Sequence, residues 1–385
     1  MGRDAVARVS EHPSLKILVV LTSLCAEGTP ILALEMCRWW LTHGIQPQIV
    51  TLNTSPTDLI PEFQHLGIPI ECLDLAQRGY WRYWQMVKYF FHLARTFQPD
   101  ALLSMPLGWH TFMAYGARLA GVTQIAAHVG NYPAYWTGMA FRKFRWEVQL
   151  GRPVTSKLIC CSHYVRQGVI QHFGVKEVET ITIYNGCPIE SFKHHSSSLN
   201  SLQSGDTFTI GMVARLEVHK DQPTLIRAAR LLKDRGVAAQ VQLIGEGSRR
   251  KEYEALIRAE QVEDCVQLLG MRRDVPRLLG KLDIFVFSAK PDEGLGVALI
   301  EAMAAGVPIV ATAVGACCEV LDEGQLGLLA PPEDPQQMAE AICEIMNHPG
   351  EAKQRAKQAR EKVFREFTIE KMALEYAHCL GLVTT

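Results

Sequence analysis

The feature that most constrains the fold is an alternation of short apolar runs with segments of helical spacing, which occurs twice along the chain. In the first half the apolar runs span 15–21, 46–52, 68–73, 101–104, 124–128 and 158–162. In the second half they span 208–213, 240–244, 266–269, 283–287 and 307–311. Short, continuously apolar runs are typical of parallel strands that helices cover on both faces. The pattern therefore predicts an α/β fold built from two Rossmann-like units.

Glycines and a polar stretch mark the boundaries between these segments. Helical spacing at 223–233 stops before Gly236, and that at 297–305 stops at Gly306, as glycine C-caps predict. A serine-rich stretch at 194–206 contains few large apolar residues and is typical of a linker.

We therefore predict four parts of the chain, with the following bounds: an N-terminal Rossmann-like domain at 1–193, a linker at 194–207, a C-terminal Rossmann-like domain at 208–365, and a final helix at 366–385 that could pack back on the N-terminal domain. Ligands of such folds bind at the carboxyl ends of the parallel strands. We expect the site where the two domains face each other across a cleft.

Composition excludes several classes of protein. The formal net charge is -1, so the chain lacks the overall positive charge that holds proteins on nucleic acid. The eleven cysteines form no C-x-x-C pair and no metal-ligand spacing, which is typical of a reducing compartment. The apolar run at 15–21 is too short to span a bilayer and has no small-residue cleavage site. We expect a cytoplasmic protein.

The segment 288–314 carries the strongest chemical signal. A predicted strand ends near Ser288, and a helix begins at about Gly296. The N–H groups of Leu295, Gly296 and Val297 would lack partners inside this helix, and together with the helix dipole they would attract an anion. Gly294 and Gly296 have no side chain that would keep a ligand from the backbone. This turn is a candidate diphosphate site.

Two carboxylates flank this turn. Glu293 precedes the helix and Glu301 follows eight positions later, within the helix. Carboxylates accept hydrogen bonds from hydroxyls, so one could bind ribose and the other a sugar while a diphosphate lies between them. The alternative is that both are solvated charges at a helix end, where glutamate is common in any case.

The motifs, taken in order, resemble a known family. The sequence PDEGLGVALIEAMAAGVPIVAT at 291–312 resembles the E-x7-E signature of the retaining glycosyltransferases of family 4, which have the GT-B fold. The following segments resemble the same family in the expected order: CAEGTPILALEMCRWWLTHGI, YNGCPIESF, IGMVARLEVHKDQPTLIRAARLL, LIGEGSRRKEYEALI and GLLAPPEDP. The resemblance covers nearly the whole chain. It implies GT-B architecture and retaining transfer of a sugar from a nucleotide diphosphate sugar to an acceptor hydroxyl, in polysaccharide or glycoconjugate synthesis. It also implies that the domain at 1–193 binds the acceptor and that the domain at 208–365 binds the donor.

The resemblance also implies roles for three further residues. Arg215 and Lys220 would contact the donor diphosphate and neutralise the charge that grows on the leaving phosphate. Because metal ions perform that task in other transferases and no Asp-x-Asp motif is present, we expect no metal and no cofactor. His128 would lie near the transferred sugar, with Asn131 as a weaker candidate. The alternatives are surface charges without a role and a structural histidine.

The resemblance leaves the partners broad. The donor would be a UDP-sugar, with a GDP-sugar as the alternative, and the acceptor would be a sugar or a lipid-linked molecule.

The family usually has two adjacent glycines in its first loop, whereas this chain has Glu27 followed by Gly28. Gly28 alone can provide a close backbone approach there, and Glu27 could crowd the diphosphate or contact the acceptor. A later glycine pair of the family is replaced in this chain by Gly315 and Ala316, ahead of Glu319, a change with little steric effect.

Two stretches, 78–95 and 132–152, interleave aromatic and basic residues and are almost without acidic ones. Such helices bind anionic membrane surfaces, which would place the protein at the inner face of the membrane. They equally suit core packing or an acceptor site.

Two rival functions stay open. One is a nucleotide-sugar epimerase, and the other is a catalytically inactive sugar-nucleotide binding protein. A nicotinamide dehydrogenase is disfavoured because the turn at 22–30 lacks G-x-G-x-x-G.

Overall fold

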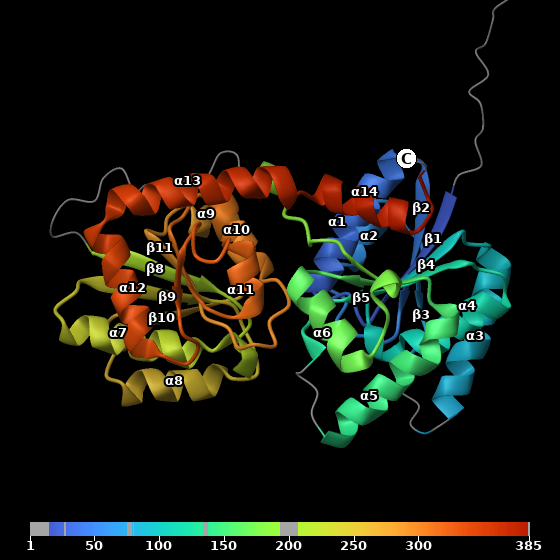
Figure 1. Ribbon diagram of the computed structural model, residues 1–385, viewed down its shortest axis with the longest axis horizontal. Helices are drawn as coiled ribbons and strands as arrows, with labels where there is room; N and C mark the ends of the chain where they lie inside the picture. The colour runs from blue at the N-terminus through green and yellow to red at the C-terminus, as the bar shows by residue number, and fades with distance from the viewer. Residues whose placement is uncertain are drawn as a thin grey trace, which may run out of the picture. The chain divides into compact units, whose positions relative to one another are not determined.

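The computed structural model describes residues 15–26, 28–74, 79, 81–133, 138–192 and 207–383. Its strands form two parallel sheets with helices between successive strands (Figure 1), which confirms the predicted α/β class. By their internal contacts the residues divide into two compact units. The first comprises Met1–His128, Leu150–Lys157 and Ala373–Thr385, and the second comprises Val129–Gln149 and Leu158–Met372. The predicted linker, apart from its last residue, lies outside the described residues.

The first sheet has seven strands in the order β3-β2-β1-β4-β5-β6-β7. Their bounds are β1 Leu15–Leu21, β2 Ile45–Thr51, β3 Ile70–Cys72, β4 Ala101–Ser104, β5 Gln124–Val129, β6 Lys157–Cys160 and β7 Thr180–Thr182. The accompanying helices are α1 Gly28–Thr42, α2 Ile60–His65, α3 Trp81–Phe97, α4 His110–Leu119, α5 Gly138–Gly151 and α6 His163–Phe173. An order that runs outward from β1 in both directions is typical of doubly wound nucleotide-binding sheets.

The core of the first unit lies between this sheet and two helices. Leu18 of β1 and Leu102 of β4 are fully buried against Phe90 of α3 and Met113 of α4. Burial of a side chain of this size stabilises a fold by roughly 1.5–3 kcal/mol. The last helix, α14 (Ile369–Cys379), also contributes to the unit, because the buried Trp40 indole donates a hydrogen bond to the Ala373 carbonyl at 2.9 Å.

The second sheet has six strands in the order β10-β9-β8-β11-β12-β13, again running outward from its first strand. Their bounds are β8 Phe208–Val213, β9 Ala239–Ile244, β10 Val266–Gly270, β11 Ile284–Phe287, β12 Ile309–Thr312 and β13 Leu328–Ala330. The accompanying helices are α7 Gln222–Asp234, α8 Arg250–Ala259, α9 Val275–Leu279, α10 Val297–Ala305, α11 Gly315–Val320, α12 Pro335–Asn347 and α13 Pro349–Glu366.

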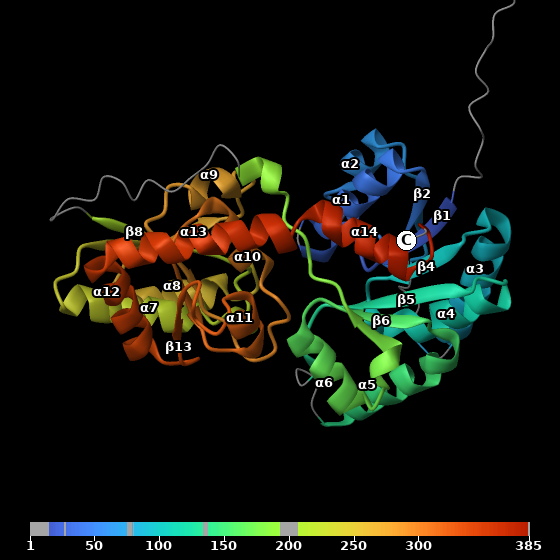
Figure 2. The same cartoon turned by 45° about the horizontal axis from the view of Figure 1, so that its top comes forward.

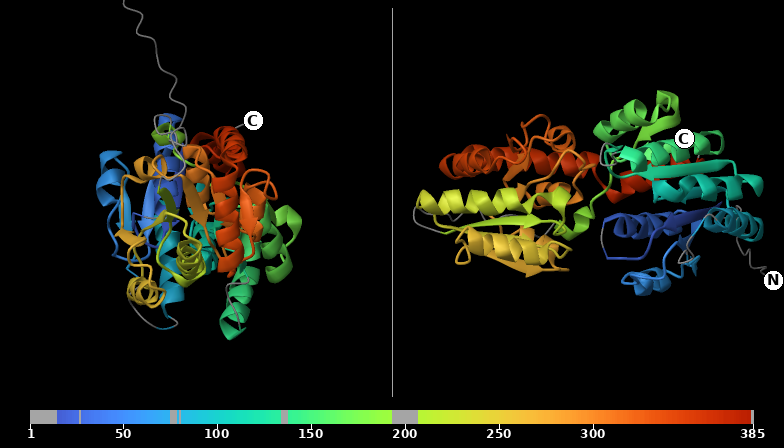
Figure 3. Two further views of the ribbon diagram at one scale, coloured as in Figure 1. Left: turned by 90° about the vertical axis from the view of Figure 1, so that its left-hand side faces the viewer. Right: turned by 90° about the horizontal axis from the view of Figure 1, so that it is seen from below.

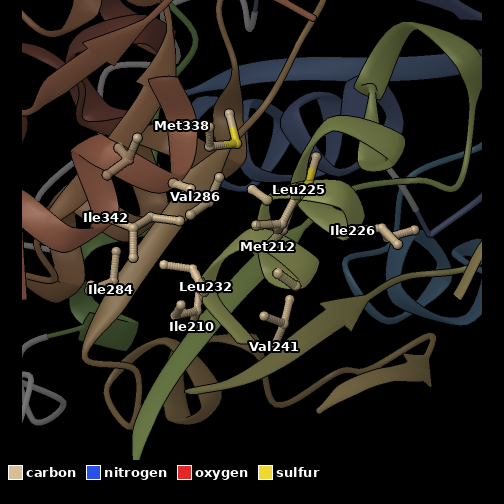
Figure 4. Packing of buried hydrophobic residues seen from close by; sticks show 14 of the residues in the cluster. Ile210, Met212, Leu225, Ile226, Leu232, Val241, Ile284, Val286, Met338 and Ile342 are labelled. Atoms are coloured by element: carbon tan, nitrogen blue, oxygen red, sulfur yellow. The ribbon is translucent and has the colours of Figure 1, made fainter. Parts of the chain in front are cut away.

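Helices cover both faces of the second sheet. On one face α7 and α12 pack together, and Figure 4 shows Leu225 of α7 and Ile342 of α12 near Met212 and Ile210 of β8, which are buried in one cluster. On the other face α10 lies beside α13 (Figures 1 and 2). Figure 3 shows the same layers from two further directions. Because both faces are covered, the strand ends are the part of the sheet left to bind a ligand.

The structure differs from the sequence expectation mainly at element ends. Strand β3 is shorter than the predicted run at 68–73, while β7 and β13 are edge strands of three residues each that were not predicted. Helix α10 has the predicted bounds, and Gly306 follows it in the left-handed conformation with φ +70°. Within the parts of the chain that the structure describes, no helix is both long and apolar enough to cross a membrane.

Candidate functional site

An ion pair joins two of the predicted site residues in the second unit. The Lys220 ammonium, in the loop after β8, contacts the carboxylate of Glu293, in the loop after β11. The exposed fraction of the side chain is 17% for Lys220 and only 8% for Glu293. Burial alone would raise the pKa of the Glu293 carboxyl, but the neighbouring Lys220 charge outweighs it and lowers that pKa. Glu293 is therefore held as a buried anion beside a cation.

Backbone contacts hold the two loops against each other. The buried Ser288 hydroxyl donates a hydrogen bond to the Asp221 carbonyl at 2.9 Å, and Lys290 N–H donates to the His219 carbonyl at 3.0 Å. Lys220 lies between those two carbonyls in the sequence, and its ammonium also lies 5.5 Å from the centre of the Phe287 ring. The lysine is thus fixed by packing as well as by its charge.

Arg215 lies two residues after the end of β8 and is exposed at the surface of the second unit. Its carbonyl accepts a hydrogen bond of 2.7 Å from the Gln222 side chain at the start of α7. This bond joins the two ends of the loop that also contains Lys220. Two cations therefore lie on one short loop at the carboxyl end of β8.

The turn before α10 has the backbone geometry expected of an anion site. Gly296 has φ +80°, a left-handed conformation that side chains disfavour, and its carbonyl accepts hydrogen bonds from Leu299 and Ile300. Across the residues that the structure describes, no hydrogen bond is donated by the N–H groups of Leu295, Gly296 or Val297. These three groups are free to bind a ligand.

Glu301 lies in the second turn of α10 and is partly buried. Desolvation by burial raises the pKa of its carboxyl to about 7. No side chain of the described residues pairs with it. Burial raises the pKa of the nearby Cys187 thiol, and the charge of Glu301 raises it further. Helix α10 also contacts the short helix Ile189–Phe192, which follows Cys187. A carboxylate left without a partner in partly desolvated surroundings is a candidate ligand-binding group.

Two predicted site residues belong to the first unit. His128 in β5 is buried, and its Nδ1 lies 2.8 Å from the hydroxyl of Tyr376 in α14. Burial lowers the pKa of the imidazole to about 4, so the ring is neutral at physiological pH. Gly28 is the exposed first residue of α1, with φ +37°. Asn131 is exposed and belongs to the second unit, while Glu27 lies outside the described residues.

Sequence reasoning missed a group of residues that contact the loop at 291–294. The Ser162 hydroxyl donates to the Gly294 carbonyl, and the Tyr164 hydroxyl donates to the Pro291 carbonyl. Ser162 was included in the predicted run at 158–162, but it is the N-cap of α6, and a serine at the end of an apolar run is an N-cap signal from which the start of this helix could have been predicted. No pattern in the sequence indicated what that helix start touches.

In the described parts of the chain no group of acidic, histidine or cysteine side chains is arranged to hold a metal ion.

Two family profiles match consecutive parts of the chain. The profile of Glycosyltransferase Family 4 matches residues 26–191, and that of Glycosyl transferases group 1 matches residues 198–362. Together they span most of the chain, and the second contains Arg215, Lys220 and both glutamates.

Individual relatives match over shorter stretches. WcaL of Salmonella typhimurium, a protein of colanic acid biosynthesis, is 31% identical over 179 residues, which are 44% of each chain. The amylovoran biosynthesis glycosyltransferase AmsK of Erwinia amylovora is 33% identical over 162 residues, which are 40% of each chain. The match spans less than half the length of these relatives.

Solved structures match over nearly the full length. HepE of Anabaena, solved in complex with UDP and glucose, superimposes with a TM-score of 0.82 at 21% identity, covering 96% of this chain and 100% of that one. At this identity the likeness shows the fold alone. Because the two profile matches together span most of the chain, the chain belongs to the group 1 glycosyltransferases of family 4.

Proposed function

We propose that the protein is a glycosyltransferase that moves a sugar from a nucleotide diphosphate sugar to an acceptor hydroxyl. One observation carries the proposal: the Lys220–Glu293 ion pair lies beside a helix start with three free N–H groups. A cation and unpaired N–H groups would bind a diphosphate, and a buried carboxylate would bind sugar hydroxyls. The unpartnered Glu301 would bind the ribose. The domain bounds given in the sequence analysis remain part of this proposal.

The chemistry would consist mainly of positioning and charge stabilisation. The bond between the sugar's anomeric carbon and the phosphate oxygen breaks, a bond from that carbon to the acceptor oxygen forms, and the acceptor proton passes to the leaving phosphate. We favour attack from the same face, which retains the anomeric configuration. Lys220 and Arg215 would stabilise the negative charge on the diphosphate as it leaves. Because these cations would do the work of a metal, we expect activity to survive chelation with EDTA.

His128 would take part as a neutral ring. Since the pKa of the imidazole is lowered to about 4, it can bond sugar hydroxyls but brings no positive charge to the reaction. Its Nδ1 is already engaged with the Tyr376 hydroxyl, so Nε2 is the atom left for a substrate.

The donor is proposed to be a UDP-sugar and the acceptor a sugar or lipid-linked molecule. The matched HepE structure contains UDP and glucose, and the relative AmsK is named for synthesis of the polysaccharide amylovoran. The test is a thermal-shift screen of UDP, GDP and ADP, followed by assay of nucleotide release with and without acceptors. A nucleotide that binds only the folded state raises its stability by several kcal/mol when saturating. An epimerase would convert the donor without an acceptor, and an inactive binding protein would bind without turnover.

We also propose contact with an anionic membrane at the cytoplasmic face, supported by exposed apolar side chains on two basic helices. In α3 the exposed fractions of Trp81 and Trp84 are 77% and 65%, and in α5 those of Met139 and Trp146 are 83% and 62%. Aromatic side chains interleaved with basic ones bind headgroups. The protein should co-sediment with anionic vesicles at low salt and be released by high salt. Equal recovery in the supernatant with and without vesicles would remove the idea.

A further inference from the structure

We propose that the first turn of α6 is a clamp that fixes the loop at 291–296, here called the donor loop, so that Ser162 and Tyr164 are positioning residues for the site. That this loop binds the donor rests on the proposed function. The clamp itself consists of contacts within the second unit, which do not depend on that function. None of the clamp residues carries the chemistry.

Three carbonyls of the donor loop accept hydrogen bonds from outside it. Pro291 accepts from the Tyr164 hydroxyl at 2.7 Å, and Gly294 accepts from the Ser162 hydroxyl at 2.6 Å. The Asp292 carbonyl accepts a longer bond, 3.3 Å, from the Tyr132 N–H. Three of four consecutive peptide units in the loop are therefore tied to residues that lie far away in the sequence.

The bond from Ser162 sets the direction of a candidate ligand-binding group. In a trans peptide unit the carbonyl and the next N–H point in opposite directions within one plane. Fixing the Gly294 carbonyl therefore fixes the Leu295 N–H, which is one of the three free donors at the start of α10. Ser162 is fully buried, and its hydroxyl also accepts from the Val165 N–H at 3.1 Å, so its orientation is fixed at both ends.

Close packing leaves the loop little room to move. A Cβ atom on Gly294 would lie 1.9 Å from the Gly130 carbonyl oxygen, and one on Gly315 would lie 2.2 Å from the Tyr164 ring. The Tyr164 ring also stacks on that of Tyr132, with ring centres 4.3 Å apart. Both glycines are thus positions where another element presses directly on the backbone.

Glu319 of α11 fixes the clamp itself. Its two carboxylate oxygens accept hydrogen bonds of 2.8 Å from the N–H groups of His163 and Tyr164, the first two residues of α6. One of those oxygens also accepts a 2.7 Å bond from the Tyr184 hydroxyl. A carboxylate at a helix start is favoured by the dipole and satisfies N–H groups that the helix cannot. The helix turn that carries both positioning side chains is therefore anchored to the donor domain's own α11.

The test is Tyr164→Phe, with Tyr115→Phe as the matched control. Both tyrosines donate to a backbone carbonyl, Tyr164 to Pro291 and Tyr115 to Leu150 at 3.0 Å, but only the first carbonyl is in the donor loop. The first readout is amide hydrogen exchange of a peptide covering 290–297 in the free protein. Loss of one neutral hydrogen bond predicts about fivefold faster exchange in Tyr164→Phe, and no change there in the control. Ser162→Ala should have at least the same effect.

The second readout is the affinity for UDP compared with that for uridine. Because the free N–H groups would bind the diphosphate, Tyr164→Phe should weaken UDP binding by about fivefold and leave uridine binding unchanged. Faster exchange with unchanged UDP affinity would support the clamp and count against the donor role of the loop. The clamp would be overturned if amide exchange at 290–297 were the same in Tyr164→Phe, Ser162→Ala and the control. This conclusion would hold for any result of the UDP affinity measurement.

Discussion

Replacement of Glu301 by glutamine should make the protein more stable at pH 8 and leave its stability almost unchanged at pH 5. Burial raises the pKa of this carboxyl from 4.5 to about 7. The folded state therefore keeps the proton between those values, whereas the unfolded chain releases it. A group of this kind loses its favourable contribution as the pH rises through that window. Glutamine has nearly the same shape and no proton to lose.

The magnitude follows from the size of the shift. One pKa unit corresponds to 1.36 kcal/mol, so the full shift would cost the wild type about 3 kcal/mol once the carboxyl is ionised in the fold. Because the Glu301 side chain is only partly buried, solvent screens part of this, and we expect a gain of about 1–2 kcal/mol in Glu301→Gln at pH 8.

The assay is urea denaturation of both proteins at pH 5 and pH 8, comparing the difference in free energy of unfolding between them. Groups that titrate elsewhere contribute equally to both proteins and cancel in the difference. The same difference at the two pH values would refute the reasoning, because it would mean that Glu301 is not desolvated. Binding of UDP should be weaker in the variant at pH 8, since the ribose would lose a charged acceptor.

Three further outcomes are expected. Lys220→Ala leaves the buried Glu293 carboxylate without its ion-pair partner, so it should lower the free energy of unfolding, measured in urea, by about 3 kcal/mol. Glu293→Ala should lower kcat more than it lowers the affinity for UDP. Arg215→Ala and Lys220→Ala should each lower kcat/KM about a hundredfold, and the double variant should lose less than the two losses combined; near wild-type turnover in either single variant would place the phosphate site elsewhere. His128→Gln should lower kcat/KM by the same factor at pH 5.5 and pH 8, because the ring is neutral at both; a larger loss at pH 5.5 would mean that the charged ring takes part.

The sequence predicted most of the fold because buried parallel strands are nearly continuous apolar runs. Strand β1 and helix α10 have the predicted bounds. The edge strands β7 and β13 escaped prediction because each has only three residues, too few to show a pattern. The loop before α10 was predicted from its two glycines, of which Gly296 has a left-handed backbone conformation and Gly294 packs closely against the Gly130 carbonyl.

The candidate site was predictable only in part. The family resemblance indicated Lys220, and the predicted strand and helix placed Glu293 in the loop between them. Neither indicated that the two side chains touch, since they are 73 residues apart in the sequence. The contacts of Ser162, Tyr164 and Glu319 depend on the packing of elements from distant parts of the chain. Local sequence patterns do not predict contacts between such distant residues.

The return of α14 to the first unit has a consequence for synthesis on the ribosome. Trp40 and His128 are made early, whereas their partners Ala373 and Tyr376 emerge more than 200 residues later than either. Domains generally fold as they leave the ribosome, at about 5–20 residues per second. For tens of seconds the first unit must therefore exist without its last helix, and the surface around Trp40 that this helix later contacts is exposed. That interval is when chaperones would be expected to bind this chain.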